Sequence, residues 1–188
     1  GYALAAALWR RGAEVELVTG PTELAPPVGP AVRRVETAEE MCAQVVRSAP
    51  EADALFMVAA VADFRPRGPG AGKLRRREGP PVLELELAPD VLAAARPQLP
   101  AHALAVAFAL EVDPEGAVER AEAKRAERGL DCVVLNLASE PGAGFEVETN
   151  RVTLCLAGGR RVDLPPGAKA EVAEAILDHL EPLLRPAP

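Results

Sequence analysis

Residues 54–60 read Ala-Leu-Phe-Met-Val-Ala-Ala, and residues 132–137 read Cys-Val-Val-Leu-Asn-Leu. Both runs are short and almost wholly apolar, which is typical of strands that are buried on both faces. Strands of this kind occur in parallel sheets whose two faces are covered by helices. The two stretches therefore predict an α/β fold with a parallel sheet between two helix layers.

Helical and strand patterns alternate along most of the chain, as they do in a doubly wound sheet. The patterns predict helices at 1–11, 38–48, 90–98, 114–128 and 169–184, and strands at 14–19, 32–35, 54–60, 82–87, 103–109 and 132–137. We expect Pro114 in the first turn of its helix and Gly129 just after the end of that helix.

The last part of the chain has a different pattern. Residues 151–156 and 160–164 flank the turn Ala157-Gly158-Gly159 and predict a β-hairpin. In the closing helix, Val172, Ile176, Leu180 and Leu184 form one apolar stripe. We therefore expect a single Rossmann-like, doubly wound, mostly parallel α/β domain over 1–188, with a C-terminal hairpin and helix.

Composition limits the partners of this 188-residue chain, which carries a net charge of −7. Nucleic-acid binding generally needs a basic face that replaces the counterions of the phosphates, so we expect no nucleic-acid partner. No apolar run reaches the roughly 18 residues of a membrane span, and no signal-peptide pattern is present. We expect no membrane partner and a cytoplasmic location.

The cysteines Cys42, Cys132 and Cys155 are widely spaced among apolar neighbours. Their number and setting indicate buried core residues in a reducing compartment rather than disulfides. The chain has two histidines and no C-x-x-C motif, so it offers few ligands for a dedicated metal site. We expect metal only as an ion that accompanies a bound phosphate.

Ligands of doubly wound sheets bind where the carboxyl ends of the strands meet. The loop after the 54–60 run continues Val-Ala-Asp and contains Ala59, Ala60 and Asp63. Its small residues allow a planar ring to approach the backbone, and the Asp63 carboxylate could accept a hydrogen bond from a ribose hydroxyl. The alternative is that Asp63 is an ordinary solvated turn residue.

Four cations lie within the five positions 73–77, beginning with Lys73, in an otherwise acidic chain. This pattern predicts a basic flap over a triphosphate, although such runs are also common in surface loops. Of the 21 basic residues only Lys73, Lys124 and Lys169 are lysines. Lysine that persists in an arginine-rich chain favours a role for a compact point charge.

Three further segments contain candidate binding residues. Lys124 and Arg128 lie four residues apart on one helix face, where cations also complement the helix dipole. Phe108 ends a strand and could stack on a base, although a core position is the alternative. The turn at 88–91 places Asp90 at the N-cap of a helix, whose neighbouring N–H groups could also face a ligand.

Taken together, these loops resemble the phosphopantothenate–cysteine ligases, coenzyme A biosynthetic enzymes that bacteria often fuse behind a flavin-dependent decarboxylase. The resemblance runs almost from end to end. Its most specific part is the alanine-rich loop that ends at Asp63, with Lys73 ten residues later. The other similar stretches are 12–21, 35–41, 64–66, 74–76, 130–131 with Asn136, 150–154 and 169–173.

This resemblance implies CTP-dependent ligation of 4′-phosphopantothenate to cysteine through an acyl-cytidylate, with Mg²⁺ accompanying the CTP. Asp63 would bind the ribose, and Lys73 would be the catalytic cation that neutralises charge on the phosphates. The other residues implied to contact or border the nucleotide are Ala59, Ala60, Ala88, Pro89, Asp90, Val91, Phe108, Lys124 and Arg128. The resemblance also implies a homodimer with the acyl substrate near the subunit boundary, and fusion to or association with a decarboxylase.

The chain departs from the family pattern at three positions. Ala88 stands where the family usually has Asn, Ala107 where Gly is usual, and Arg128 where Lys is common. The resemblance further implies a first strand and a Gly/Ser/Asn loop upstream of Gly1 that help to bind phosphate and the acyl intermediate. We therefore expect the residues named above to be only part of the site.

Two other function classes compete with the ligase. The first is an NAD(P)-dependent reductase, which usually has a charged residue after its second strand to bind the ribose. Here the corresponding strand ends in Thr19-Gly20-Pro21, which disfavours this reading. The second is a non-catalytic α/β dimerisation module.

Overall fold

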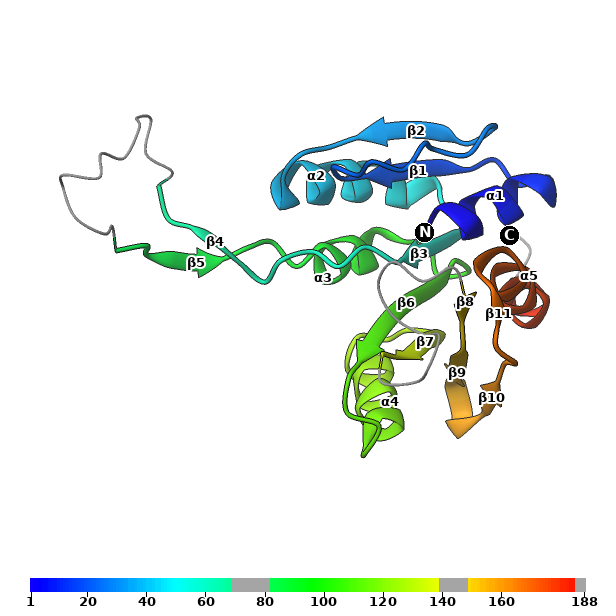
Figure 1. Ribbon diagram of the computed structural model, residues 1–188. Coiled ribbons are helices and arrows are strands. Elements are labelled where there is room, and N and C mark those ends of the chain that lie inside the picture. Colours follow the sequence, from blue (N-terminus) through cyan, green and yellow to red (C-terminus); the bar gives the residue numbers. More distant parts are fainter. Residues whose placement is uncertain (69–81, 139–148, 185–188) are drawn as a thin grey trace.

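The computed structural model describes residues 1–68, 82–138 and 149–184, and Lys73 lies outside them (Figure 1). The helices are α1 (Tyr2–Arg10), α2 (Ala38–Ser48), α3 (Val91–Ala95), α4 (Ala117–Glu127) and α5 (Lys169–Leu180). The strands are β1 (Glu16–Thr19), β2 (Ala31–Arg34), β3 (Ala54–Met57), β4 (Phe64–Pro66), β5 (Leu85–Leu87), β6 (Leu104–Glu111), β7 (Cys132–Leu137), β8 (Thr149–Asn150), β9 (Val152–Leu156), β10 (Arg161–Asp163) and β11 (Gly167–Ala168).

The central sheet has five strands in the order β10-β9-β7-β6-β3. β3 and β7 both run parallel to β6, whereas β9 runs antiparallel to β7 and forms a hairpin with β10. β1 and β2 form a separate parallel pair. The mostly parallel, Rossmann-like α/β architecture and the C-terminal hairpin are thus confirmed.

Alternation of side chains along the strands divides the core into two layers. Ala105 and Ala107 of β6 and Val133 of β7 face the cluster formed with α2, α3 and α4. Val106 and Val134, which directly follow Ala105 and Val133, face the cluster formed with α1 and α5. Helices therefore cover both faces of the sheet, which is why the strands that decide the fold are apolar at almost every position.

Local features explain where α2 begins and where α4 ends. At the start of α2, the Thr37 hydroxyl accepts a bond of 3.1 Å from the Glu40 N–H, and the Glu40 carboxylate accepts the N–H groups of Glu36 and Thr37. This capping box uses N–H groups that have no partner within the helix. At the end of α4, Gly129 adopts φ 60°, the left-handed conformation expected there.

Several predicted boundaries are wrong. Pro114 precedes α4 rather than entering its first turn, because Gly116 adopts φ 68° and starts the helix at Ala117. β3 ends at Met57, three residues before the end of the apolar run. At the C-terminus α5 ends at Leu180, so Leu184 lies beyond it and is 42% exposed instead of extending the buried stripe.

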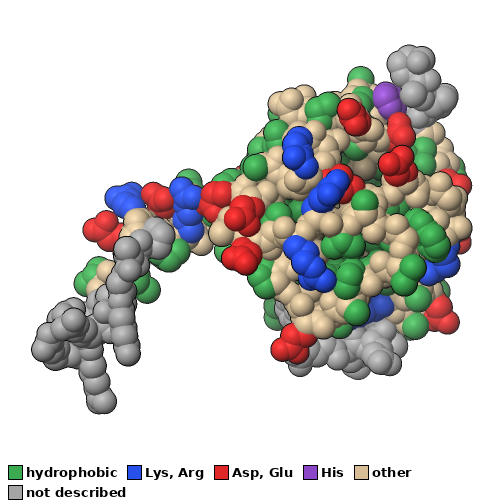
Figure 2. Space-filling model, turned by 90° about the horizontal axis from the view of Figure 1, so that it is seen from above, with side chains coloured by type: hydrophobic (Ala, Val, Ile, Leu, Met, Phe, Trp, Pro, Cys, Tyr) green, Lys and Arg blue, Asp and Glu red, His purple; other side chains and the backbone are tan. Residues whose placement is uncertain are grey.

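The segment after Asp63 begins with a strand that is not among the predicted ones, β4, which pairs with β5 in an antiparallel ribbon. Figures 1 and 2 show this ribbon as an arm that projects from the body, with basic and acidic side chains alternating along it. Arg65 lies opposite Glu86, pairs with it, and also pairs with Glu39 of α2. The opposite side of the ribbon carries Phe64, Pro66, Leu85 and Leu87, all exposed.

Candidate functional site

An open cavity of about 810 Å³ lies at the carboxyl ends of the parallel strands. Its walls come from the segments after β1, β2 and β3, from the second half of β6, and from the ends of β7 and β8. Residues from α1 and α5 complete the lining of the cavity. This is the edge at which doubly wound sheets bind their ligands.

The structure brings the two predicted nucleotide loops together. Ala59 and Ala60 are exposed and line the cavity. Three residues further on, the carbonyl oxygen of Asp63 accepts a hydrogen bond of 2.9 Å from the Ala88 N–H. This bond holds the loop after β3 against the turn at 88–91. The lining of the cavity ends at Ala62, so the exposed Asp63 follows the last lining residue, and the turn at 88–91, Lys124 and Arg128 do not line the cavity.

Asp90 caps α3, as predicted from the sequence. Its carboxylate accepts a bond of 2.9 Å from the Ala93 N–H and also pairs with the Arg128 guanidinium. Burial would raise the pKa of Asp90, but the N–H donor and the guanidinium outweigh it and hold the pKa below its ordinary value. Arg128 is therefore engaged with Asp90, and Val91 beside it is a core residue, 2% exposed.

Lys124 and Phe108 are in contact, but through the backbone. The Lys124 ammonium donates to the Phe108 carbonyl oxygen at 3.2 Å, on the side of the sheet that α4 covers. The Phe108 ring lies on the opposite face, packed against the cluster of α1 and α5, where it lines the cavity. A ligand that contacts both side chains would have to cross the carboxyl edge of the sheet.

Three polar side chains at the cavity were not among the predicted site residues. Asn136 lies near the end of β7, Asn150 ends β8, and Lys169 begins α5, and all three line the cavity. The Oδ1 atoms of both asparagines are buried and accept no hydrogen bond from the residues that the structure describes. The sequence offers two signals for them: an amide at the end of an apolar strand, and the place of Asn136, 150–154 and 169–173 among the stretches that resemble the ligase family.

The end of β1 also borders the cavity, and it is where a dinucleotide-binding protein would bind a ribose. The Thr19 hydroxyl there is 3.1 Å from the Tyr2 hydroxyl, and Thr19 is 9% exposed. This position has no charged side chain and its hydroxyl is already paired. The geometry therefore gives no support to the reductase alternative.

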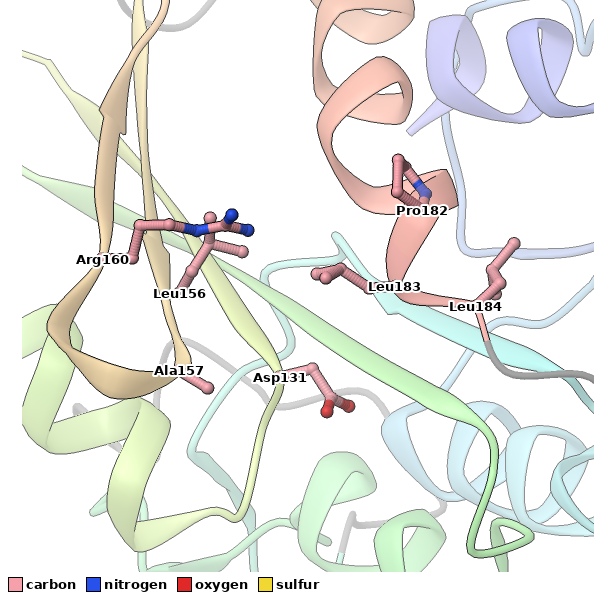
Figure 3. Close-up of a pocket in the computed structure, with 7 residues that line it drawn as sticks. All are labelled: Asp131, Leu156, Ala157, Arg160, Pro182, Leu183 and Leu184. Carbon is pink, nitrogen blue, oxygen red and sulfur yellow. The ribbon is translucent and has the colours of Figure 1, made fainter.

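A second cavity of about 590 Å³ opens at the other end of the sheet (Figure 3). Asp131, just before β7, and Leu156, at the end of the antiparallel β9, line it together with Arg160 and the segment after α5. The Asp131 carboxylate accepts a bond of 2.8 Å from the Ala105 N–H and so joins two strands. Most of the wall is aliphatic, and the loops of the predicted site lie at the opposite edge.

None of the helices in the described ranges has both the length and the apolar character that a membrane crossing requires. Among the same residues, no group of three or more His, Cys, Asp or Glu side chains is arranged so that it could hold a metal ion.

A family model described as the DNA/pantothenate metabolism flavoprotein C-terminal domain matches residues 1–183. The chain belongs to this family. The coenzyme A biosynthesis bifunctional protein CoaBC of Mycobacterium tuberculosis is 40% identical over 189 residues, which cover 96% of this chain and 45% of the relative. A cysteine/cysteine sulfinic acid decarboxylase from an unknown prokaryotic organism is 38% identical, covering 94% of this chain and 49% of the relative.

Solved structures support membership of the DNA/pantothenate metabolism flavoprotein C-terminal domain family. The C-terminal domain of a CoaBC protein has a TM-score of 0.77 and 34% identity, covering 98% of this chain and 83% of that chain. A mutant of Cab2 in complex with phosphopantothenate-cysteine has a TM-score of 0.61 and 15% identity, covering 81% and 53%, and shows a likeness of fold alone. The chain thus spans about half the length of its bifunctional relatives and 83% of the solved C-terminal domain of CoaBC.

Proposed function

We propose that this protein joins 4′-phosphopantothenate to cysteine in a CTP-dependent ligase reaction of coenzyme A biosynthesis. The proposal rests chiefly on the hydrogen bond between Asp63 and Ala88, which sets two candidate nucleotide loops against each other beside the cavity. Membership of the family and 40% identity to a CoaBC protein support the pathway.

The reaction needs activation, because a carboxylate resists attack by an amine. In the proposed route the carboxylate of 4′-phosphopantothenate attacks the α-phosphate of CTP and pyrophosphate leaves. The cysteine amine then attacks the acyl-cytidylate, forming the amide and releasing CMP. Anionic charge accumulates in the first step, and the cations Lys73 and Lys124 would stabilise it.

We assign the nucleotide to the edge formed by Ala59, Ala60, Asp63 and the turn at 88–91. Small side chains allow a ring to lie against the backbone, and the exposed Asp63 carboxylate can accept from ribose hydroxyls. Arg128 would act through Asp90, which it already pairs with, and so would position the turn rather than contact phosphate directly.

Mg²⁺ would arrive with the triphosphate, where it would neutralise phosphate charge. Mg²⁺ commonly keeps several waters and needs only one or two carboxylates besides the phosphates. The exposed carboxylate of Asp63 beside the cavity and that of Glu36, which lines it, fit an ion of this kind, and the described residues offer no cluster that would hold it without the nucleotide.

The CoaBC relatives are bifunctional and this chain matches only about half of each, so one of two activities has to be assigned to it. One similar protein is a decarboxylase. We assign the ligase to this chain because the loops at its candidate site are those for which the family resemblance implies nucleotide contacts. The decisive assay uses the full-length gene product with 4′-phosphopantothenate, cysteine and, in turn, CTP, ATP or no nucleotide. Release of pyrophosphate and formation of phosphopantothenoylcysteine with CTP are expected.

Controls separate the alternatives in the same assay. A variant of the full-length product that carries Lys73→Gln should lose ligation but keep any decarboxylation that a flavin supports. Titration with NADPH should show no binding that competes with CTP. If a folded protein releases no pyrophosphate with either CTP or ATP, the ligase assignment is wrong.

We also propose that the arm formed by β4 and β5 pairs with a second copy of the chain. Its apolar side bears Phe64, Leu85 and Leu87, which are 58%, 56% and 74% exposed, while Arg65 on its polar side is held by Glu39 and Glu86. An isolated two-stranded ribbon is at best marginally stable in water, so an apolar side left in solvent favours a partner. A homodimer agrees with the family resemblance.

The sheet suggests where the implied upstream strand would pair. Among the described residues, β3 is hydrogen-bonded to β6 along one edge only, and β1 to β2 along one edge only. We propose that a parallel strand upstream of Gly1 bridges these two open edges, and that the loop after it completes the phosphate-binding part of the cavity. The residues assigned above then form one side of a larger site.

A further inference from the structure

The chain contains only two asparagines, Asn136 and Asn150, and both line the same cavity. Both Oδ1 atoms are buried, and within 1–68, 82–138 and 149–184 neither has a hydrogen-bond donor. Buried polar atoms are nearly always hydrogen-bonded, so two unpaired acceptors at one cavity call for an explanation. A ligand that donates hydrogen bonds to them would supply it.

Strand register places both asparagines on the same side of the sheet. Asn136 lies opposite Val152 on β9, and Asn150 is two residues before Val152 on the same stretch of chain. Val152 faces the cluster of α1 and α5, and alternation places the two asparagines on that face as well. The Phe108 ring lies there too, whereas Lys124 and Val91 lie on the other face.

A cation stands at the same wall of the cavity. Lys169 begins α5 directly after β11, and β11 pairs with β8 so that Gly167 lies opposite Asn150. Lys169 is exposed and lines the cavity, and the described residues show no ion pair of its side chain with a carboxylate. One of the three lysines and both asparagines of the chain therefore converge on one wall.

This wall has a definite chemical preference. Two amide oxygens require N–H or O–H donors, and an ammonium requires an anion. The candidate nucleotide residues Val91 and Lys124 are on the opposite face of the sheet. Phe108, Ala59 and Ala60 line the same cavity, but from β6 and the loop after β3, so the wall formed by β7, β8 and α5 is left for the other substrates. Both 4′-phosphopantothenate and cysteine carry an anionic group together with N–H or O–H donors.

We propose that Asn136, Asn150 and Lys169 form the subsite for a non-nucleotide substrate of the ligase. Lys169 binds its anionic group, and the two asparagine oxygens accept hydrogen bonds from its N–H or O–H groups. The inference rests on the proposed function and adds to it the residues that hold the acid or the amino acid. The shared chemistry fits either of the two substrates, and the kinetic experiment distinguishes them.

The test compares KM values for CTP, 4′-phosphopantothenate and cysteine in the full-length gene product and in Asn150→Ala, Lys169→Gln and Lys169→Arg. The first two variants should raise KM for one non-nucleotide substrate by about tenfold, as expected for the loss of one hydrogen bond to a charged or buried group. KM for CTP should stay within about twofold of the wild type. Lys169→Arg should recover most of the loss, because it keeps the charge.

The substrate whose KM rises is the one that occupies the subsite. Arg160→Gln is the matched control, since it removes an exposed cation at the other end of the sheet and should change none of the three KM values. Melting temperatures identify a variant that does not fold. If Asn150→Ala fails to fold, the exposed Lys169→Gln still decides the proposal.

Two outcomes overturn the subsite. One is an unchanged KM for both non-nucleotide substrates in folded Lys169→Gln, and the other is an equal rise in all three KM values. Either result in an active wild-type enzyme rejects the subsite and leaves the ligase proposal standing. A wild-type protein that forms no product with CTP or ATP rejects the ligase proposal itself.

Discussion

Lys73 is the residue on which the proposed chemistry depends most directly. Replacing it by glutamine should lower kcat by about 10²- to 10³-fold, the usual effect of losing one preorganised group that stabilises charge in the transition state. The melting temperature should stay unchanged, because the substitution is expected to act on the reaction and not on the core. Steady-state pyrophosphate release and a thermal melt check both parts, and near-normal turnover would remove Lys73 from the mechanism.

Asp90 allows its two roles to be separated. Asp90→Ala removes the cap of α3 and should lower the free energy of unfolding by ~1 kcal/mol. Asp90→Asn keeps a capping side chain and loses only the exposed pair with Arg128, so its cost should be a small fraction of that. Urea unfolding of both variants tests this. Equal losses would show that the ion pair, and not the cap, stabilises the turn at 88–91.

For single residues, the sequence correctly predicted Asp90 as a helix cap but could not predict the partners of Arg128 and Lys124. An N-cap is a local feature that depends on a few adjacent residues, so Asp90 was recognisable. The pairing of Arg128 with Asp90 joins residues 38 positions apart. Similarly, the contact of Lys124 with the Phe108 carbonyl depends on how α4 packs on β6.

The β4–β5 arm exposes an apolar side, which we propose is covered by a second copy of the chain. Leu85→Glu combined with Leu87→Glu should convert a dimer into a monomer, because two carboxylates would be buried without partners in the proposed interface. Sedimentation velocity at micromolar concentration measures the change. Val28→Glu is the matched control, since Val28 is 86% exposed on another part of the surface and its replacement should leave the dimer intact. A double variant that remains dimeric would rule out the arm as the interface.

Most elements followed from their sequence patterns, and the errors have local physical causes. The helix at 38–48 was predicted with the correct ends, and the capping box of Thr37 and Glu40 accounts for its start. The start of α4 was misplaced because Pro114 suits a first turn, whereas the backbone reverses at Gly116 in a left-handed conformation. β4 was missed because a strand of three exposed residues has no apolar pattern and exists only through its pairing with β5.

The two buried thiols make the stability of the whole molecule sensitive to alkaline pH. Burial raises the pKa of Cys132 to about 12 and also raises that of Cys155. In the unfolded chain a thiol has a pKa of about 8.5. The folded state therefore binds protons more tightly, so this contribution to stability is complete below about pH 8.5 and is lost as the pH rises toward 12.

The expected result is a lower urea midpoint at pH 10.5 than at pH 7.5. A variant with Cys132→Val and Cys155→Val keeps apolar side chains of similar size and should lose less stability over the same range. Cys132 and Cys155 face opposite layers of the core, so the double substitution tests both layers and no disulfide between them is expected. An identical pH dependence in the two proteins would assign the effect to other groups.

The layered fold, the alternation of strands and helices, and the position of the Asp63 loop were all readable from local pattern, because apolar periodicity and turn chemistry act over a few neighbouring residues. Folding alone brought Ala88 to Asp63, put Phe108 and Lys124 on opposite faces, and gathered Asn136, Asn150 and Lys169 at one cavity. These arrangements depend on strand register and helix packing between distant segments. No local pattern encodes such contacts, since their free energy comes from burying surfaces that meet only in the folded chain.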